Sequence, residues 1–294
     1  MSGKRAEAAV EAGFPCWRAR LELEFARRDA RSVLARRAHD GPLVVQKALH
    51  PEGDAVCHAV VVHPPGGVAS GDRLEIDVTV AAGAHALLTT PGATKWYRSR
   101  GGAAGSEGEV ERSRQALVAR VAAGATLEWL PQENIVFDAA RAELDTRLEL
   151  ARGARMVGWE IVCLGRSASG ERFTRGELAQ RTELFIDGRL VWRERGTLDG
   201  GGDLLRSPVG LDGKTVYGTL WLAGLAPERA LLERLRAVAV AGVVCGVTAL
   251  PEVTLARALA DDGEALRACF AALWREARPG WLGREAIPPR IWAT

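Results

Sequence analysis

The chain has 294 residues, 47% of them hydrophobic, and a formal net charge of +2 at pH 7. This length can bury a substantial core, while the near-neutral charge gives no electrostatic basis for binding nucleic acid or an anionic membrane. The longest apolar run, residues 237–250, is shorter than the roughly 20 residues that span a bilayer. The five cysteines form no C-x-x-C pair. Scattered cysteines are typical of a reducing compartment, so we expect a cytoplasmic protein without membrane contact.

The N-terminal part of the chain divides into an unpatterned segment and a strand-like one. Residues 1–14 are small or charged and carry no hydrophobic period, so we expect a disordered tail. From Trp17 to Phe25 apolar residues alternate with charged ones, and residues 74–80 repeat this period of two. Such alternation predicts half-buried strands. Because no Gly/Ser/Pro-rich linker follows, we predict a single domain over residues 15–294.

A short Gly-Ala motif recurs between strand-like runs. Residues 80–84 and 121–125 both read VAAGA, and residues 150–154 read LARGA. Glycine allows the chain to turn sharply with a positive φ angle. Repeated corners between short strands predict a β-helix-like stack of β layers. The spacing of the copies is irregular, however, and chance recurrence in an Ala/Gly-rich chain is the alternative.

Helical patterns occur only late in the chain. Pro227 occupies a favoured first-turn position before a leucine-rich segment. Asp261 or Asp262 could cap a second helix, whose apolar face would consist of Leu266, Cys269, Phe270 and Leu273. The sequence therefore predicts a mainly β protein with two α-helices near the C-terminus.

No segment carries a complete catalytic or nucleotide-binding motif. Residues 92–95 read GATK, but a phosphate-binding loop needs Gly-Lys-Ser/Thr, and Trp96 follows the lysine here. No Cys or His residues have zinc-type spacing, and the adjacent Cys57 and His58 would point to opposite faces of a strand, which favours structural roles. We therefore predict a binding or scaffold protein rather than an enzyme. Two alternatives remain: a hydrolase using paired carboxylates on a β scaffold, or a passive structural subunit.

Two turn-forming clusters stand between strand-like runs. Residues 63–72 read HPPGGVASGD, and residues 89–99 read TTPGATKWYRS. Turns that join successive layers of a β stack align on one side, so we predict that these clusters shape one functional surface or tunnel mouth. The pair Trp96 and Tyr97 could equally be core or interface. The residues expected at this surface are His63, Gly66, Gly67, Lys95, Trp96, Tyr97 and Arg98.

Several carboxylates lie in apolar β contexts. A buried carboxylate needs a partner, and pairing with the abundant arginines is the simpler interpretation. The other interpretation is a polar interior path for a divalent cation, because oxygen ligands without thiolates favour loose, exchangeable binding. The candidates for such a path are Asp72, Glu133, Asp138 and Glu160.

The same motifs carry a resemblance to a known family. The two turn clusters, residues 127–137 (LEWLPQENIVF) and the ending PPRIWAT over residues 288–294, resemble the urease accessory protein UreD (UreH) family, in the same order. The resemblance implies a β-helix-like fold with a pair of helices and no catalysis. It also implies a chaperone that joins UreF-like and UreG-like partners to urease apoprotein and assists nickel delivery. No tightly bound cofactor is implied, only transient Ni²⁺.

Overall fold

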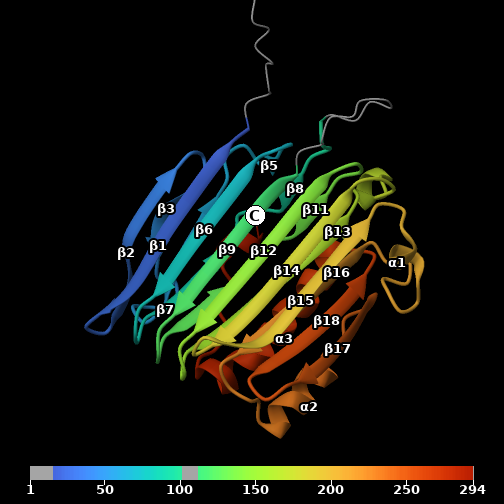
Figure 1. Ribbon diagram of the computed structural model, residues 1–294. Helices are drawn as coiled ribbons and strands as arrows, with labels where there is room; N and C mark the ends of the chain where they lie inside the picture. Colours follow the sequence, from blue (N-terminus) through green and yellow to red (C-terminus); the bar gives the residue numbers. More distant parts are fainter. Residues whose placement is uncertain (1–15, 101–111, 294) are drawn as a thin grey trace, which may run out of the picture.

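The computed structural model describes residues 16–100 and 112–293, so the expected disordered tail lies outside the described residues. Two β-sheets pack face to face (Figure 1). The seven-stranded sheet has, in spatial order, β15 (Arg189–Asp199), β14 (Glu177–Ile186), β12 (Arg141–Leu150), β9 (Ser113–Val121), β6 (Arg73–Val80), β1 (Arg18–Arg28) and β2 (Arg31–Asp40).

The second sheet has eleven strands. Its main path runs through β17 (Val243–Ala249), β18 (Val253–Ala260), β16 (Val216–Ala223), β13 (Arg155–Leu164), β10 (Thr126–Trp129), β7 (His85–Thr89), β4 (Cys57–Val62) and β3 (Val44–Leu49). Three short strands branch from this path: β5 (Gly67–Val68), β8 (Thr94–Trp96) and β11 (Asn134–Val136). The prediction of a mainly β protein is confirmed.

The Gly-Ala motifs join the two sheets. Each lies at a corner between strands of different sheets: β6 and β7, β9 and β10, β12 and β13. Their glycines, Gly83, Gly124 and Gly153, have φ angles of 73°, 69° and 80°, which side chains other than glycine rarely adopt. Successive crossings place the central strands of each sheet parallel. Antiparallel pairs flank this centre, so the β-helix-like detail stays a prediction.

The main core lies between the sheets because strand residues alternate between the two faces. In β12, Ala142, Leu144 and Leu148 are buried in this core. The intervening residues point outward and form ion pairs across the open face, such as Arg147 with Glu149 at 2.6 Å. That face of the seven-stranded sheet is therefore polar.

Helices cover the other face of the eleven-stranded sheet and enclose a second core. They are α2 (Arg229–Ala237) and α3 (Gly263–Leu282), as Figure 1 shows at the C-terminal end of the chain. Asp262 caps α3 by accepting a hydrogen bond from the Glu264 N–H at 3.0 Å, and the predicted apolar face of this helix is buried. The described residues also form a third α-helix, α1 (Asp203–Arg206), which is too short to show a hydrophobic period.

Among the described residues, no helix has the length and apolar character needed to cross a membrane.

The two ends of the C-terminal region differ in how well the sequence places them. The sequence predicts that the first of the two late helices begins at Pro227, but α2 begins at Arg229 with Glu228 in the capping position. The described residues end with a 3₁₀ turn, η2 (Arg290–Ala293). This turn contacts the eleven-stranded sheet, where the Trp292 indole N–H donates to the Thr89 hydroxyl at 2.8 Å.

Candidate functional site

The two turn clusters lie side by side. Strand β5 of the first cluster pairs in parallel with β8 of the second, with Gly67 opposite Lys95. A Cβ atom on Gly67 would overlap the ring of Tyr97, so only glycine allows this approach. Trp96 is a core residue, 1% exposed, and its indole N–H donates to Asn134 Oδ1 at 3.0 Å. Tyr97 lies at the surface and contacts Phe137 edge to face, with 5.3 Å between ring centroids.

Behind these turns, a first cavity of about 270 Å³ lies between the sheets. Its exposed lining residues are Gly66, Pro91, Gly92 and Lys95, so it opens between the two turn clusters. The polar side chains of Gln132 and Asn134 also line it. This volume has room for several water molecules.

A second cavity of about 580 Å³ lies farther along the same interior. Its exposed lining includes Arg195 of β15 and Val244 of β17, the edge strands of the two sheets. It therefore opens where the two sheets diverge. Across this opening, Arg257 of one sheet and Glu194 of the other form an ion pair at 3.3 Å.

Glu160 lines both cavities. It lies in β13, whose neighbouring residues Trp159 and Ile161 point to the opposite, helix-covered face. The Thr146 hydroxyl donates a hydrogen bond to its carboxylate. Burial raises the pKa of Glu160 to about 7; the Thr146 hydrogen bond opposes this shift, and the negative charge of Glu194 adds to it. Near neutral pH this carboxyl can therefore gain or lose its proton.

The other three path candidates line neither cavity. Asp72 is 4% exposed and accepts hydrogen bonds from the N–H groups of Trp17 and Ala69, both at 2.8 Å. These bonds hold the first turn cluster against the start of β1. Glu133 pairs with Arg267 at 3.3 Å, and burial raises its pKa.

Asp138 belongs to a separate surface pocket of about 300 Å³, which Tyr97 and Arg98 also line. Arg175 pairs with Asp138 at 2.6 Å, and the Thr174 N–H donates to it at 2.8 Å. Burial favours the neutral carboxyl, but the hydrogen bonds from Arg175 and Thr174 outweigh it and lower the pKa of Asp138 to about 2. The fold therefore brings His63, Gly66, Gly67, Lys95 and Glu160 to one cavity, and Tyr97, Arg98 and Asp138 to another.

Sequence reasoning missed a buried polar network under α3. Its centre is Glu128, which is fully buried in β10. Its carboxylate accepts hydrogen bonds from His85 Nε2 and Trp274 Nε1, each at 2.6 Å, and pairs with Arg278 at 3.0 Å. Although burial raises its pKa, the contacts with His85 and Arg278 lower the pKa of Glu128 to about 2. This carboxylate is therefore charged.

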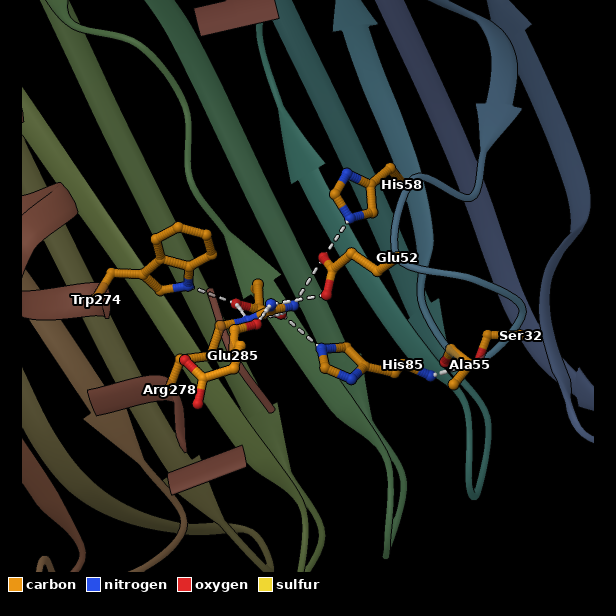
Figure 2. Close-up of polar contacts among 9 residues, drawn as sticks. Ser32, Glu52, Ala55, His58, His85, Trp274, Arg278 and Glu285 are labelled. Carbon is orange, nitrogen blue, oxygen red and sulfur yellow. Dashed lines mark hydrogen bonds and ion pairs between the residues drawn. The ribbon is translucent and has the colours of Figure 1, made fainter. Parts of the chain in front are cut away.

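The network extends to a second carboxylate. Glu52 pairs with Arg278 at 2.7 Å and accepts a hydrogen bond from His58 Nε2 at 2.6 Å. Figure 2 shows Trp274 and Arg278 pointing toward Glu52, His58 and His85. His58 thus has the structural role that the sequence favoured. Two signals could have revealed the network: Glu128 interrupts an apolar run, and Arg278 follows Trp274 by one helical turn on the apolar face of α3.

Within the described parts of the chain, no group of three or more His, Cys, Asp or Glu side chains is arranged to hold a metal ion. The polar side chains that line the first cavity include the Glu160 carboxylate, the Gln132 amide, the Thr146 hydroxyl and the His63 imidazole.

Comparison with known proteins gives the family. The UreD urease accessory protein family model matches residues 18–293. The chain belongs to this family. It is 51% identical over 288 residues to the urease accessory protein UreD of Azoarcus sp. strain BH72, covering 97% of each chain. It is 50% identical over 286 residues to the UreD of Dechloromonas aromatica strain RCB, covering 95% of this chain and 96% of the relative.

The resemblance seen in the motifs is therefore confirmed. Members of the UreD family are urease accessory proteins, so the chain is an accessory protein with a role in urease maturation. The family assignment also confirms that the chain is not an enzyme.

Proposed function

We propose that the chain joins UreF-like and UreG-like partners to urease apoprotein and provides an interior path for nickel on its way to the urease active site. One observation carries this proposal: two cavities between the sheets share Glu160 and open at different places on the molecule. A protein that only bridges partners needs no such interior.

The chemistry of the cavities suits passage rather than storage. Glu160 is the carboxylate common to both cavities, and its pKa of about 7 lets it exchange a proton for an ion near neutral pH. Without thiolates, the interior favours loose binding, which is required for release to the apoenzyme. Ni²⁺ is therefore a transient cargo in this proposal.

We further propose that the exposed turn residues contribute to a partner surface. Tyr97 is 38% exposed and Arg98 is exposed beside it, and both residue types are enriched at protein interfaces. The complex is expected in the cytoplasm, in agreement with the free thiols of Cys57, Cys163, Cys245 and Cys269.

Glu160→Gln tests the path. Glutamine keeps the shape of the side chain and can still accept the Thr146 hydrogen bond, but it cannot carry the negative charge. We expect normal co-purification with UreF-like, UreG-like and urease proteins, but nickel-dependent urease activation reduced by roughly tenfold, the lower end of the usual effect near a metal.

The matched control is Glu149→Gln, which removes a carboxylate from the outer face of the seven-stranded sheet. This variant should assemble and activate urease normally. Normal activation by Glu160→Gln would show that nickel does not depend on this carboxylate, and the interior path would be rejected.

A further inference from the structure

His63 has two unsatisfied ring nitrogens. Both are buried, and neither has a hydrogen-bond partner in the structure. Buried polar groups in folded proteins are almost always paired, so a group left unpaired calls for a specific explanation. His58, five residues earlier, shows the usual arrangement, since its ring donates to Glu52.

The position of His63 is fixed by the fold. Cys57, Ala59 and Val61 of β4 face the core between the sheets, and His63 continues this alternation and lines the first cavity. The His63 carbonyl also accepts a hydrogen bond from the Gly66 N–H at 2.8 Å, closing the first turn of the cluster. The ring is therefore placed just inside the opening.

Glu160 lies at the other side of the same cavity. Strands β4, β7, β10 and β13 are consecutive neighbours in the sheet. His63 directly follows β4 and Glu160 lies in β13, so three strand spacings separate the two residues across the sheet. At roughly 4.8 Å per spacing, this is about 14 Å. An ion that enters between the turn clusters would meet the imidazole before the carboxylate.

Burial lowers the pKa of His63, and the negative charge of Asp72 opposes this shift. Lys95 also lines the cavity, but it is exposed at the opening, where its ammonium group can remain in water.

We infer that His63 is a nitrogen-donor contact for a divalent transition-metal ion at the opening of the first cavity, and that it favours Ni²⁺ over Mg²⁺. Imidazole nitrogen suits Ni²⁺, whereas Mg²⁺ prefers oxygen ligands and loses its water reluctantly. Because both nitrogens are shielded from water, the ring must turn to reach the ion, and the contact is transient. The inference rests on the proposed nickel path and adds its selectivity.

Nuclear magnetic resonance of the full chain with ¹³C-labelled histidine tests the contact directly. The chain has five histidines, and single His→Asn variants assign their ring signals. Paramagnetic Ni²⁺, added alone below one equivalent, should broaden the His63 signal, whereas Mg²⁺ should leave it unchanged. The inference would be overturned if Ni²⁺ left the His63 signal unchanged. It would also be overturned if Mg²⁺ and diamagnetic Zn²⁺ changed this signal as much as Ni²⁺ does. The titration itself uses the natural chain, and the variants serve only to assign the signals.

A second measurement separates selectivity from structure. His63→Asn should leave complex assembly unchanged but make urease activation at limiting Ni²⁺ roughly tenfold more sensitive to competing Mg²⁺. His39→Asn, at an exposed position of β2, is the control and should behave like the natural chain. Unchanged Mg²⁺ sensitivity in His63→Asn would overturn the claim of selectivity.

The inference and the proposed path can fail separately. If Glu160→Gln activates urease normally while Ni²⁺ still broadens His63, the path is rejected and the His63 contact stands. If Glu160→Gln blocks activation while Ni²⁺ leaves His63 unperturbed, the path stands and His63 has no part in it.

Discussion

Two interior glutamates on neighbouring strands have opposite electrostatic surroundings. Glu128 on β10 faces α3, where His85 and Arg278 overcome the effect of burial and hold its pKa at about 2. Glu160 on β13 faces the interior between the sheets, where burial dominates and the nearby Glu194 adds negative charge, so its pKa is about 7. One glutamate thus stabilises the fold as a charged group, while the other can gain or lose a proton near neutral pH.

The raised pKa of Glu160 predicts a pH dependence of stability. The folded chain retains a proton that the unfolded chain releases above its ordinary pKa of 4.5. The contribution of Glu160 to the stability of the folded chain is therefore fully present below pH 4.5 and is lost as the pH rises through about 7. We expect the free energy of unfolding of the natural chain, minus that of Glu160→Gln, to fall by about 3 kcal/mol across this window.

Urea unfolding at a series of pH values measures this difference. Glu149→Gln, on the outer face, should give a difference that changes little with pH. A pH-independent difference for Glu160→Gln would mean that the pKa of Glu160 is not raised.

Two glycines of the turn clusters, Gly67 and Gly92, differ in the space that an added side chain would find. A Cβ atom at Gly67 would overlap the Tyr97 ring and crowd the Lys95 carbonyl, whereas nothing lies within 4 Å of a Cβ atom at Gly92. Neither residue has a positive φ angle in the structure. We expect Gly67→Ala to lower the free energy of unfolding by about 1–3 kcal/mol and Gly92→Ala to change it by less than about 1 kcal/mol. Equal effects in denaturant titrations would show that β5 and β8 do not approach this closely.

At the scale of elements, the buried network attaches α3 to the eleven-stranded sheet. Arg278 of α3 pairs with Glu128 of β10 and with Glu52 of the loop before β4. Its guanidinium also donates to the Glu285 carbonyl beyond the helix. One arginine thus joins the helix, the sheet and the C-terminal segment, all inside the second core.

Removing the charge of Glu128 should loosen this attachment. Glu128→Gln keeps the side-chain shape but leaves Arg278 and His85 without their central carboxylate. Breaking one partner of a buried ion pair costs about 3 kcal/mol, and urea unfolding should show a loss of this size. The control on the same helix is Glu276→Gln, which removes an exposed ion pair with Arg234 and should cost less than about 1 kcal/mol. Similar losses in both variants would contradict a special role for the network.

At the scale of the whole molecule, the Gly-Ala corners decide where the cavities lie. Because each corner carries the chain from one sheet to the other, consecutive strands stack in the same order in both sheets. The turns at the opposite ends of these strands then gather around the first cavity. The second cavity arises where β15 and β17 end the two sheets without pairing to each other.

The sequence by itself determined the elements whose cause is local. Period-two alternation predicts β1 and β6, and the Gly-Ala motifs predict the corners. Asp261 or Asp262 predicts the start of α3, and the structure shows that Asp262 is the cap. The motifs also pointed to the UreD family, which the comparison confirmed. Each of these features depends on residues that are close together in the chain, so a pattern in the sequence is enough to show it.

Only the tertiary structure decided which acidic residues share an interior. Asp72, Glu133, Asp138 and Glu160 lie in similar apolar contexts along the chain, yet Glu160 alone among them lines the cavities between the sheets. Partners distant in sequence decide the difference: Glu128 pairs with Arg278, 150 residues away, whereas Glu160 faces its neighbours across the sheet interface. The charge of a buried carboxylate depends on the groups packed around it, and folding alone brings those groups together.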